Sequence, residues 1–484
     1  MSDHRENEHI VENRALNLWE ALIPVLILML LLAYNIFFKE GVWLGDYSNH
    51  YILLMGAVVA AIVGFFNKTS LLTMATEIWE NLKSVFVPIL ILFLVGALAG
   101  SWLVSGIIPA MVYYGLQVLN PTIFLPASVI IAAIISIATG SSWTTSATVG
   151  IALIGIGQAL GIHPGMIAGA VISGAYFGDK MSPLSDTTNL APAMAGTDLF
   201  THIKYMSLTT VPTIVVTLIV FVIISLTIDT SGTADVSALL GVIDDTFNTT
   251  PLLFIVPAVV VALIVLKTKP IIALSAGVIL AAIFAFIFQA DILQGLSESN
   301  FQAIITAIWT DTAIETPNAT LNELFSSGGI TGMLWTIYLI CCAMVFGGVM
   351  DGIGALARIT KSLLSIADSI FGLFASTVIS CLGLNIVASD QYLALVIPGK
   401  MFKKAYEDRG LAPENLSRTL EDSGTVTSVL IPWNTCGAYQ SGVLGVSVLD
   451  YFVYAIFNWL SPFMTLLFAG LRIKIRQING TLEK

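Results

Sequence analysis

Long apolar stretches alternate with short polar ones along this chain, and most approach the roughly 20 residues that a helix needs to cross hydrocarbon. Within each stretch, apolar residues follow one another, whereas the strands of a membrane barrel would alternate apolar and polar residues. The pattern predicts an all-α polytopic membrane protein with about 10–14 transmembrane or re-entrant helices. The clearest spanning candidates are residues 20–38, 51–66, 84–104, 205–227, 252–266, 271–288, 330–349 and 451–471.

Four further apolar stretches are less regular. Residues 121–160 and 370–402 are each long enough for a pair of helices or a re-entrant hairpin. Residues 165–195 and 420–445 are apolar but interrupted by polar residues, which predicts broken helices. Discontinuous helices commonly form the substrate sites of secondary transporters, so these stretches are the candidates for a functional core.

The composition supports this class. Of the 484 residues, 56% are hydrophobic and only 11% are charged, whereas a soluble domain carries about 25% charged residues on its hydrated surface. Residues 1–18 mix acids and bases, unlike the short basic start of a cleaved signal peptide, so the first apolar run is expected to remain a membrane helix. The four cysteines lie in apolar segments without metal-site spacing and are expected to pack as small residues.

The basic residues predict an orientation. With the N-terminus inside, every Lys and Arg except Lys39 and Lys180 falls at an inner segment. The two predicted outer loops, 229–250 and 290–329, contain acidic residues but no Lys or Arg. Inner loops of membrane proteins are enriched in Lys and Arg, so both termini are predicted to lie in the cytoplasm.

The two broken stretches indicate an internal duplication. Pro183 and Pro432 are 249 residues apart, as are the dipeptides His163-Pro164 and Ala412-Pro413. The first unit starts from the inner side and the second from the outer side, so the repeats are predicted to be inverted, as in many transporters. The expected organisation is a tail with two helices (1–84), repeat 1 (85–228), connecting helices with acidic outer loops (229–329), repeat 2 (330–471) and a cytoplasmic tail (472–484).

The first break is the most informative segment. The chain is predicted outside near 161–165 and inside at Lys204, so residues 165–195 must cross the membrane despite their polar centre. Irregular backbone at that depth is tolerated only inside protein or beside a wet cavity. The candidate ligands for a cation or proton are Asp179, Ser182, Asp186, Thr187 and Asn189, with Lys180, Pro183 and Ser142 in supporting roles. The plainer alternative is that one of the aspartates only neutralises Lys180.

The second break supplies a matching set of candidates. Asn434 and Thr435 follow the proline break, and Asp390, next to Ser389, lies between two apolar runs. Asp390 has the alternative of capping a helix end. The supporting residues Glu421 and Asp422 lie near Arg418, and their alternative is an acidic helix end at the cytoplasmic surface. The predicted Na⁺ ligands are Asp179, Asp186 and Asp390.

The segment 178–192, Gly-Asp-Lys-Met-Ser-Pro-Leu-Ser-Asp-Thr-Thr-Asn-Leu-Ala-Pro, resembles the NhaC family of bacterial Na⁺/H⁺ antiporters. Residues 388–392 and 421–437 are also similar, and the likeness extends over roughly 85–471. The resemblance implies exchange of Na⁺ for H⁺ at the plasma membrane. The family also includes malate/lactate antiporters coupled to Na⁺ and protons.

The predicted function is therefore secondary active transport, in which Na⁺ and H⁺ compete for shared buried carboxylates and the repeats rock to expose the site alternately. The alternative is an organic-acid antiporter of the malate/lactate type, with hydroxyls near 141–146 and 385–389 binding the anion. An enzyme is not expected, because no His or Cys group forms a catalytic constellation. The expected partners are Na⁺, H⁺ and the lipid bilayer, without further cofactor or nucleic acid. The sequence is compatible with a small organic acid as cargo and with a homo-oligomer.

Overall fold

The computed structural model describes residues 11–13, 15–39, 42–118, 121–227, 236–266, 268–365 and 367–478. These residues are almost entirely helical, which confirms the predicted all-α membrane class. The N-terminal part contains α2 (Leu18–Lys39), α3 (Ser48–Phe66) and α4 (Leu71–Ser84). The predicted acids Asp229 and Asp235 lie outside the described residues.

The next part of the chain contains the first broken helix. Its elements are α5 (Phe86–Val104), α6 (Ile107–Val118), α7 (Pro121–Thr139), α8 (Ser142–Thr145), the π-helical η1 (Ser146–Gly150), α9 (Ile151–Ala159), α10 (Pro164–Met181), α11 (Asp186–Ala195) and α12 (Leu199–Thr227).

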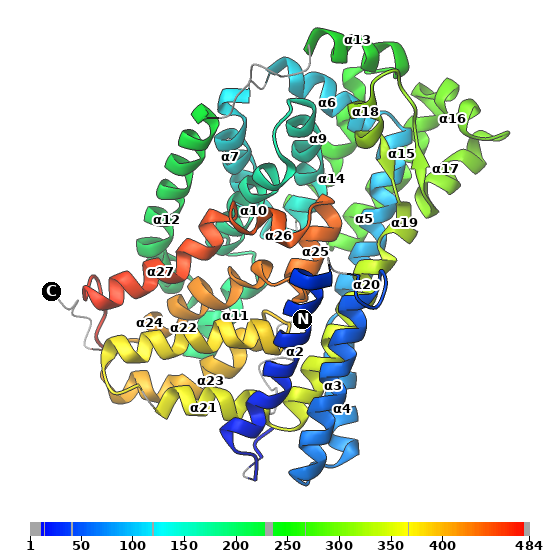
Figure 1. The fold of residues 1–484 in the computed structure, drawn as a ribbon. Coiled ribbons are helices and arrows are strands. Elements are labelled where there is room, and N and C mark those ends of the chain that lie inside the picture. The colour runs from blue at the N-terminus through cyan, green and yellow to red at the C-terminus, as the bar shows by residue number, and fades with distance from the viewer. Residues whose placement is uncertain are drawn as a thin grey trace.

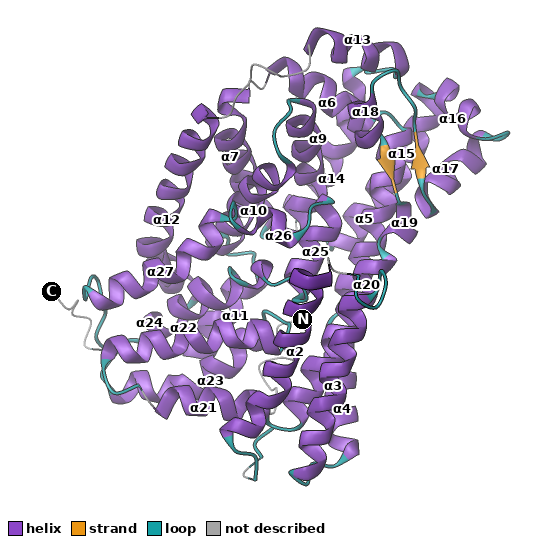
Figure 2. Ribbon diagram, in the orientation of Figure 1, coloured by secondary structure: helices purple, strands orange, loops and turns teal. Residues whose placement is uncertain are grey.

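The connecting part is helical apart from one pair of two-residue strands (orange in Figure 2). It contains α13 (Val236–Thr246), the 3-10 helix η2 (Pro251–Phe254), α14 (Ile255–Val265), α15 (Pro270–Phe288), α16 (Ala290–Leu296), α17 (Asn300–Trp309), β1 (Thr312–Ala313), α18 (Ala319–Leu324), β2 (Ser326–Ser327) and α19 (Gly329–Gly332).

The last part contains the second broken helix. Its elements are α20 (Leu334–Gly352), α21 (Ala355–Ser365), α22 (Ile370–Val387), α23 (Leu393–Asp408), α24 (Pro413–Leu420), the π-helical η3 (Glu421–Thr425), the 3-10 helix η4 (Ser428–Leu430), α25 (Thr435–Leu444), α26 (Val448–Phe452) and α27 (Ile456–Gly470).

Eight helices in the described ranges are long and apolar enough to cross a membrane, or nine if a pair bent by 86° at residues 247–250 counts as one span. Residues 121–160 and 370–402 each form two helices, as one of their alternatives predicted. Residues 165–195 and 420–445 are interrupted, again as predicted. The prediction of one continuous span over 451–471 was wrong, because residues 453–455 separate α26 from α27.

The backbone repeats several unusual features at a spacing of 249 residues. A positive φ occurs at Gly140 and Ser389, at Gly161 and Gly410, and at Gly196 and Gly445. Prolines begin both α10 and α24, and the side chains of Ser185 and Asn434 cap α11 and α25. Positive φ is uncommon outside glycine, so its recurrence at Ser389 is informative. These pairs favour the proposed duplication.

The helices pack in two groups. In the first, α20 packs on α3 and α4, and α5 packs on α15 and α17. In the second, α7 packs on α10, α22 on α23, and α12 on α27. Figure 1 shows the first group along the right of the molecule and the second towards the left. Both broken helices belong to the second group, which therefore holds the candidate site.

Glycines bring α7 and α10 into backbone contact. A Cβ at Gly174 would lie 2.2 Å from the Val129 carbonyl oxygen, and one at Gly178 would lie 2.4 Å from the Ala133 carbonyl oxygen. Small residues at such spacing let membrane helices approach closely. The hydroxyl of Ser136 also donates to the Ala175 carbonyl at 2.6 Å. This contact fixes α10, which carries Asp179 and Lys180.

We expect Gly174→Ala to destabilise the protein by about 1–3 kcal/mol, because the new methyl group overpacks the α7–α10 contact. Gly383→Ala, in α22, is the matched control, since a Cβ there meets nothing within 4 Å. Thermal unfolding of both purified variants in detergent measures the difference. Equal melting temperatures would contradict a close α7–α10 contact.

Candidate functional site

The first break is a short non-helical segment, residues 182–185, between α10 and α11. Ser182 is buried and its hydroxyl donates to the Ile137 carbonyl at 2.8 Å. Asn189 is exposed, and its amide donates to the carbonyls of Pro183 and Ser185 at 3.0 and 2.7 Å. Ser182 and Asn189 therefore stabilise the shape of the break by side-chain hydrogen bonds to the backbone, as hydroxyl and amide side chains often do.

Asp179 lies one turn before this break and is partly buried. Its Oδ2 accepts hydrogen bonds from the Ser142 backbone N at 3.0 Å and from the Ser142 hydroxyl at 2.7 Å. Ser142 begins α8 directly after the turn at Gly140, which has φ +68°. Ser185 also lies next to this carboxylate. Asp179 is thus held by hydroxyl and amide donors, and Ser142 is one of them.

Lys180 is fully buried, but its partner is neither Asp179 nor Asp186. Its Nζ forms an ion pair with Asp422 Oδ1 and lies 3.2 Å from the Ser461 hydroxyl. This corrects the alternative in which an aspartate of the same motif neutralises Lys180. Because Asp422 takes this ammonium, the charge of Asp179 is left available for another cation.

Glu421 and Asp422 are both fully buried in the π-helical turn η3, so the alternative of an acidic helix end at the surface was wrong. Arg418, expected in an inner loop, is also buried, with its guanidinium 4.6 Å from the Tyr205 ring centre. A π-helical turn inserts an extra residue and often marks a functional position. The sequence contains a signal for this burial. At the repeat spacing of 249 residues, the two acids align with Ile172 and Ser173, which lie in the middle of the buried helix α10.

A chain of hydroxyl groups connects Glu421 with the first break. Thr187 donates to Glu421 Oε1 at 3.0 Å, and the Thr187 and Ser185 hydroxyls are 3.2 Å apart. The Thr425 hydroxyl lies next to the Glu421 carboxylate. Glu421 Oε2 is buried and accepts no hydrogen bond from any residue that the structure describes. A buried polar atom without a partner is costly, so this oxygen is available to a ligand.

The three predicted Na⁺ ligands do not meet in one place. Asp186 is exposed at the start of α11. Asp390 is buried and accepts hydrogen bonds from the backbone N of Tyr392 and Leu393 at 2.8 and 3.1 Å, so it caps the start of α23. Within the described ranges, no three His, Cys, Asp or Glu side chains form a group that could hold a metal ion. The structure instead brings Glu421 towards Asp179.

Asn434 and Thr435 fix the second break. The Asn434 amide donates to the Asn385 carbonyl at 3.0 Å, and its oxygen accepts from the Cys436 backbone N at 3.0 Å. The Thr435 backbone N donates to the Ser389 carbonyl at 2.9 Å. These bonds join the turn at Ser389 to the start of α25, which gives Asn434 a structural role.

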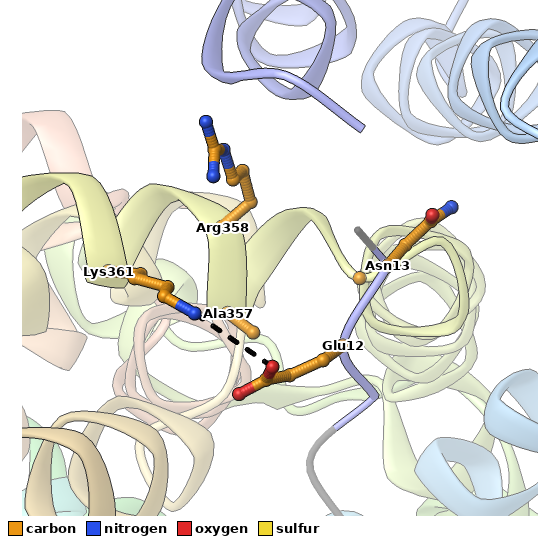
Figure 3. Close-up of a pocket in the computed structure, with 6 residues that line it drawn as sticks. Glu12, Asn13, Ala357, Arg358 and Lys361 are labelled. Carbon is orange, nitrogen blue, oxygen red and sulfur yellow. Dashed lines mark ion pairs between the residues drawn. The ribbon is translucent and has the colours of Figure 1, made fainter. Parts of the chain in front are cut away.

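A separate cavity of about 290 Å³ lies between the N-terminal segment and α21, lined by Glu12, Asn13, Gly354, Ala357, Arg358 and Lys361 (Figure 3). Lys361 Nζ and Glu12 Oε2 are 4.0 Å apart, and both side chains are more than half exposed. An exposed pair of this kind contributes little to stability. None of the predicted site residues lines this cavity.

Known proteins are similar to the chain over most of its length. Residues 174–471 match the model of the Na⁺/H⁺ antiporter family. The chain is 39% identical to the Na⁺/H⁺ antiporter NhaC of Alkalihalophilus pseudofirmus, over 90% of this chain and 93% of the relative.

Two other relatives carry different names. The arginine/ornithine antiporter ArcD of Halobacterium salinarum is 35% identical over 82% of this chain and 81% of its own length. The malate-2H⁺/Na⁺-lactate antiporter of Bacillus subtilis is 34% identical over 90% of this chain and 89% of its own length. The matched segment contains both breaks and the buried acids. The chain is a multi-pass membrane transporter that belongs to the Na⁺/H⁺ antiporter family.

Proposed function

We propose that this protein exchanges Na⁺ for H⁺, and that Asp179 and Glu421 carry the two ions in turn. The observation that carries the proposal is that Glu421 Oε2 is buried and bonded by no described residue. The other oxygen of this carboxylate is linked through the hydroxyls of Thr187 and Ser185 to Asp179. Two neighbouring carboxylates in a buried site repel each other, and either a proton or a Na⁺ relieves that repulsion. The two ions therefore compete for the same oxygens.

The ligands for Na⁺ would be the carboxylates of Asp179 and Glu421 with hydroxyls of Ser142, Ser185 and Thr187. Na⁺ is a hard cation, and these oxygens come from both broken stretches and from the start of α8. Asp186 lies at the exposed start of α11 and is not one of these ligands. Asp390, Asn434 and Thr435 instead stabilise the backbone at the second break. Rocking of one repeat against the other would move the loaded site between the two sides of the membrane.

Na⁺/H⁺ exchange fits the described residues better than transport of an organic dianion. A dianion would need a cationic partner in the core, and Lys180 already contacts Asp422. The buried Arg418 guanidinium lies over the ring of Tyr205, and its nitrogens bond no described residue, so a substrate carboxylate could still contact it and organic acids belong in the test. Two relatives are named as malate/lactate and arginine/ornithine antiporters. Malate and arginine are therefore the substrates to compare with Na⁺ in a transport assay.

We expect Asp179→Asn and Glu421→Gln each to reduce Na⁺-driven pH change by about 100-fold, since a lost charged ligand contributes about 1.5–3 kcal/mol. Reconstituted liposomes with an internal pH dye measure the rate after addition of Na⁺, malate or arginine. Malate and arginine should give no signal in the wild type.

Asp198→Asn, at an exposed carboxyl just after α11, is the control and should retain wild-type exchange. Asp186→Asn should cause only a partial loss. Full activity of Glu421→Gln would remove Glu421 from the site, and a response to malate without Na⁺ would favour an organic-acid carrier.

We also propose that both termini face the cytoplasm of a bacterial cell, with the chain in its plasma membrane. The support is the distribution of charge: Lys and Arg are absent from 290–329 but common in 400–418 and after residue 471.

Alkaline phosphatase, which is active only after export, should be inactive when fused after Lys484 and active when fused after residue 298. Comparable expression of the two fusions is the control. The opposite pattern of activity would invert the proposed topology.

A further inference from the structure

The Lys180 ammonium contacts oxygens from two other elements, and its carboxylate partner is also bonded from a third. Its Nζ contacts Asp422 Oδ1 in η3 and lies 3.2 Å from the Ser461 hydroxyl in α27. The second oxygen of Asp422 accepts hydrogen bonds from Thr209 in α12, at 2.8 Å, and from Thr465 in α27. All five side chains are at most 1% exposed. The ammonium is thus enclosed in protein.

This oxygen set suits a small hard cation. Asp422 supplies the negative charge, and each hydroxyl keeps lone pairs that can bind a cation while its proton is donated elsewhere. Of the two oxygens of Asp422, both threonines bond Oδ2, whereas Oδ1 faces the ammonium and the Ser461 hydroxyl. A carboxylate with several hydroxyls is also the ligand set proposed above for Na⁺ at Asp179 and Glu421. Lys180 therefore occupies a position with the chemistry of a cation site.

No other cation is in contact with Asp422 in the part of the chain that the structure describes. Arg418 lies one helical turn earlier, but its guanidinium packs over Tyr205 and its three nitrogens make no hydrogen bond to a described residue. At the position equivalent to Lys180 in the second unit, 249 residues later, the chain has Val429. The ammonium is thus a feature of one unit alone.

We propose that Lys180 is a tethered cation that fills a second Na⁺ site centred on Asp422. In the wild type the ammonium keeps Na⁺ out of this site, so exchange carries only the Na⁺ held by Asp179 and Glu421. Replacing Lys180 with a neutral residue opens the site, and Na⁺ then binds between Asp422 Oδ1 and the Ser461 hydroxyl. The wild-type stoichiometry rests on the proposed function, whereas the second site does not.

The test is the number of Na⁺ ions bound by purified protein in lipid nanodiscs, measured with radioactive ²²Na⁺. Wild type is expected to bind one Na⁺ per chain and Lys180→Met to bind two. The matched control is Lys180→Met combined with Asp422→Asn, which neutralises both partners and returns the number to one. A second measurement is the melting temperature of Lys180→Met, which should rise with Na⁺ more than that of either comparison protein, while choline leaves it unchanged.

The outcomes separate this proposal from the proposed function. Suppose that wild type binds no Na⁺ and that Lys180→Met binds one Na⁺, which is lost when Asp422→Asn is added. This result would support the second site and contradict the proposed Na⁺ site at Asp179 and Glu421. If Lys180→Met binds no more Na⁺ than wild type, the second site is overturned. The last outcome concerns folding. If Lys180→Met and Lys180→Gln both fail to fold at high Na⁺ while the double variant folds, then Na⁺ does not replace the ammonium. That result would also overturn the proposal.

Discussion

The buried ion pair between Lys180 and Asp422 constrains the core, because neither charge can be buried there without the other. It joins α10 to η3, and the hydroxyls around it come from α12 and α27. Removing one partner of a buried pair leaves an uncompensated charge and typically costs about 3–5 kcal/mol. The pair therefore holds the two broken stretches together. It also places Glu421, the neighbour of Asp422, beside Thr187 and the first break.

The two units share their backbone features but not their charges. Turns, helix starts and caps recur at a spacing of 249 residues, from Gly140 and Ser389 to Gly196 and Gly445. The acids of η3 correspond to Ile172 and Ser173 in α10, whereas Asp179 and Lys180 correspond to Ser428 and Val429. Each unit thus supplies charged groups where the other has neutral ones. The contacts of Thr187 with Glu421 and of Lys180 with Asp422 join the two broken stretches at the proposed site.

Much of the fold followed from the sequence, because apolar run length and proline breaks are local signals. The helix pairs at 121–160 and 370–402 and the interruptions at 182–185 and 431–434 are examples. The contact between Ser142 and Asp179 could also be anticipated from the sequence, because both residues lie in the same predicted unit. By contrast, the partner of Lys180 is 242 residues away, and no local pattern specifies such a pairing.

Two predictions about the acidic residues were wrong, for different physical reasons. Arg418 made the neighbouring acids resemble a hydrated helix end, but the aromatic ring of Tyr205 allows a guanidinium to be buried there. Asp179 and Asp186 are also indistinguishable as residue types. The geometry separates them, because Asp179 faces Ser142 and Asp186 begins a helix at an exposed position.

The residues named at the two breaks differ in burial. Pro183, Leu184 and Asp186 are exposed, whereas Trp433, Asn434 and Asp390 are enclosed. If the two units are inverted repeats, as we propose, such a difference would correspond to an open gate on one side and a closed gate on the other. If the units exchanged these two environments, the closed gate would become the open one. On that proposal, the asymmetry of burial would represent one half of a transport cycle, and the mirrored asymmetry would represent the other.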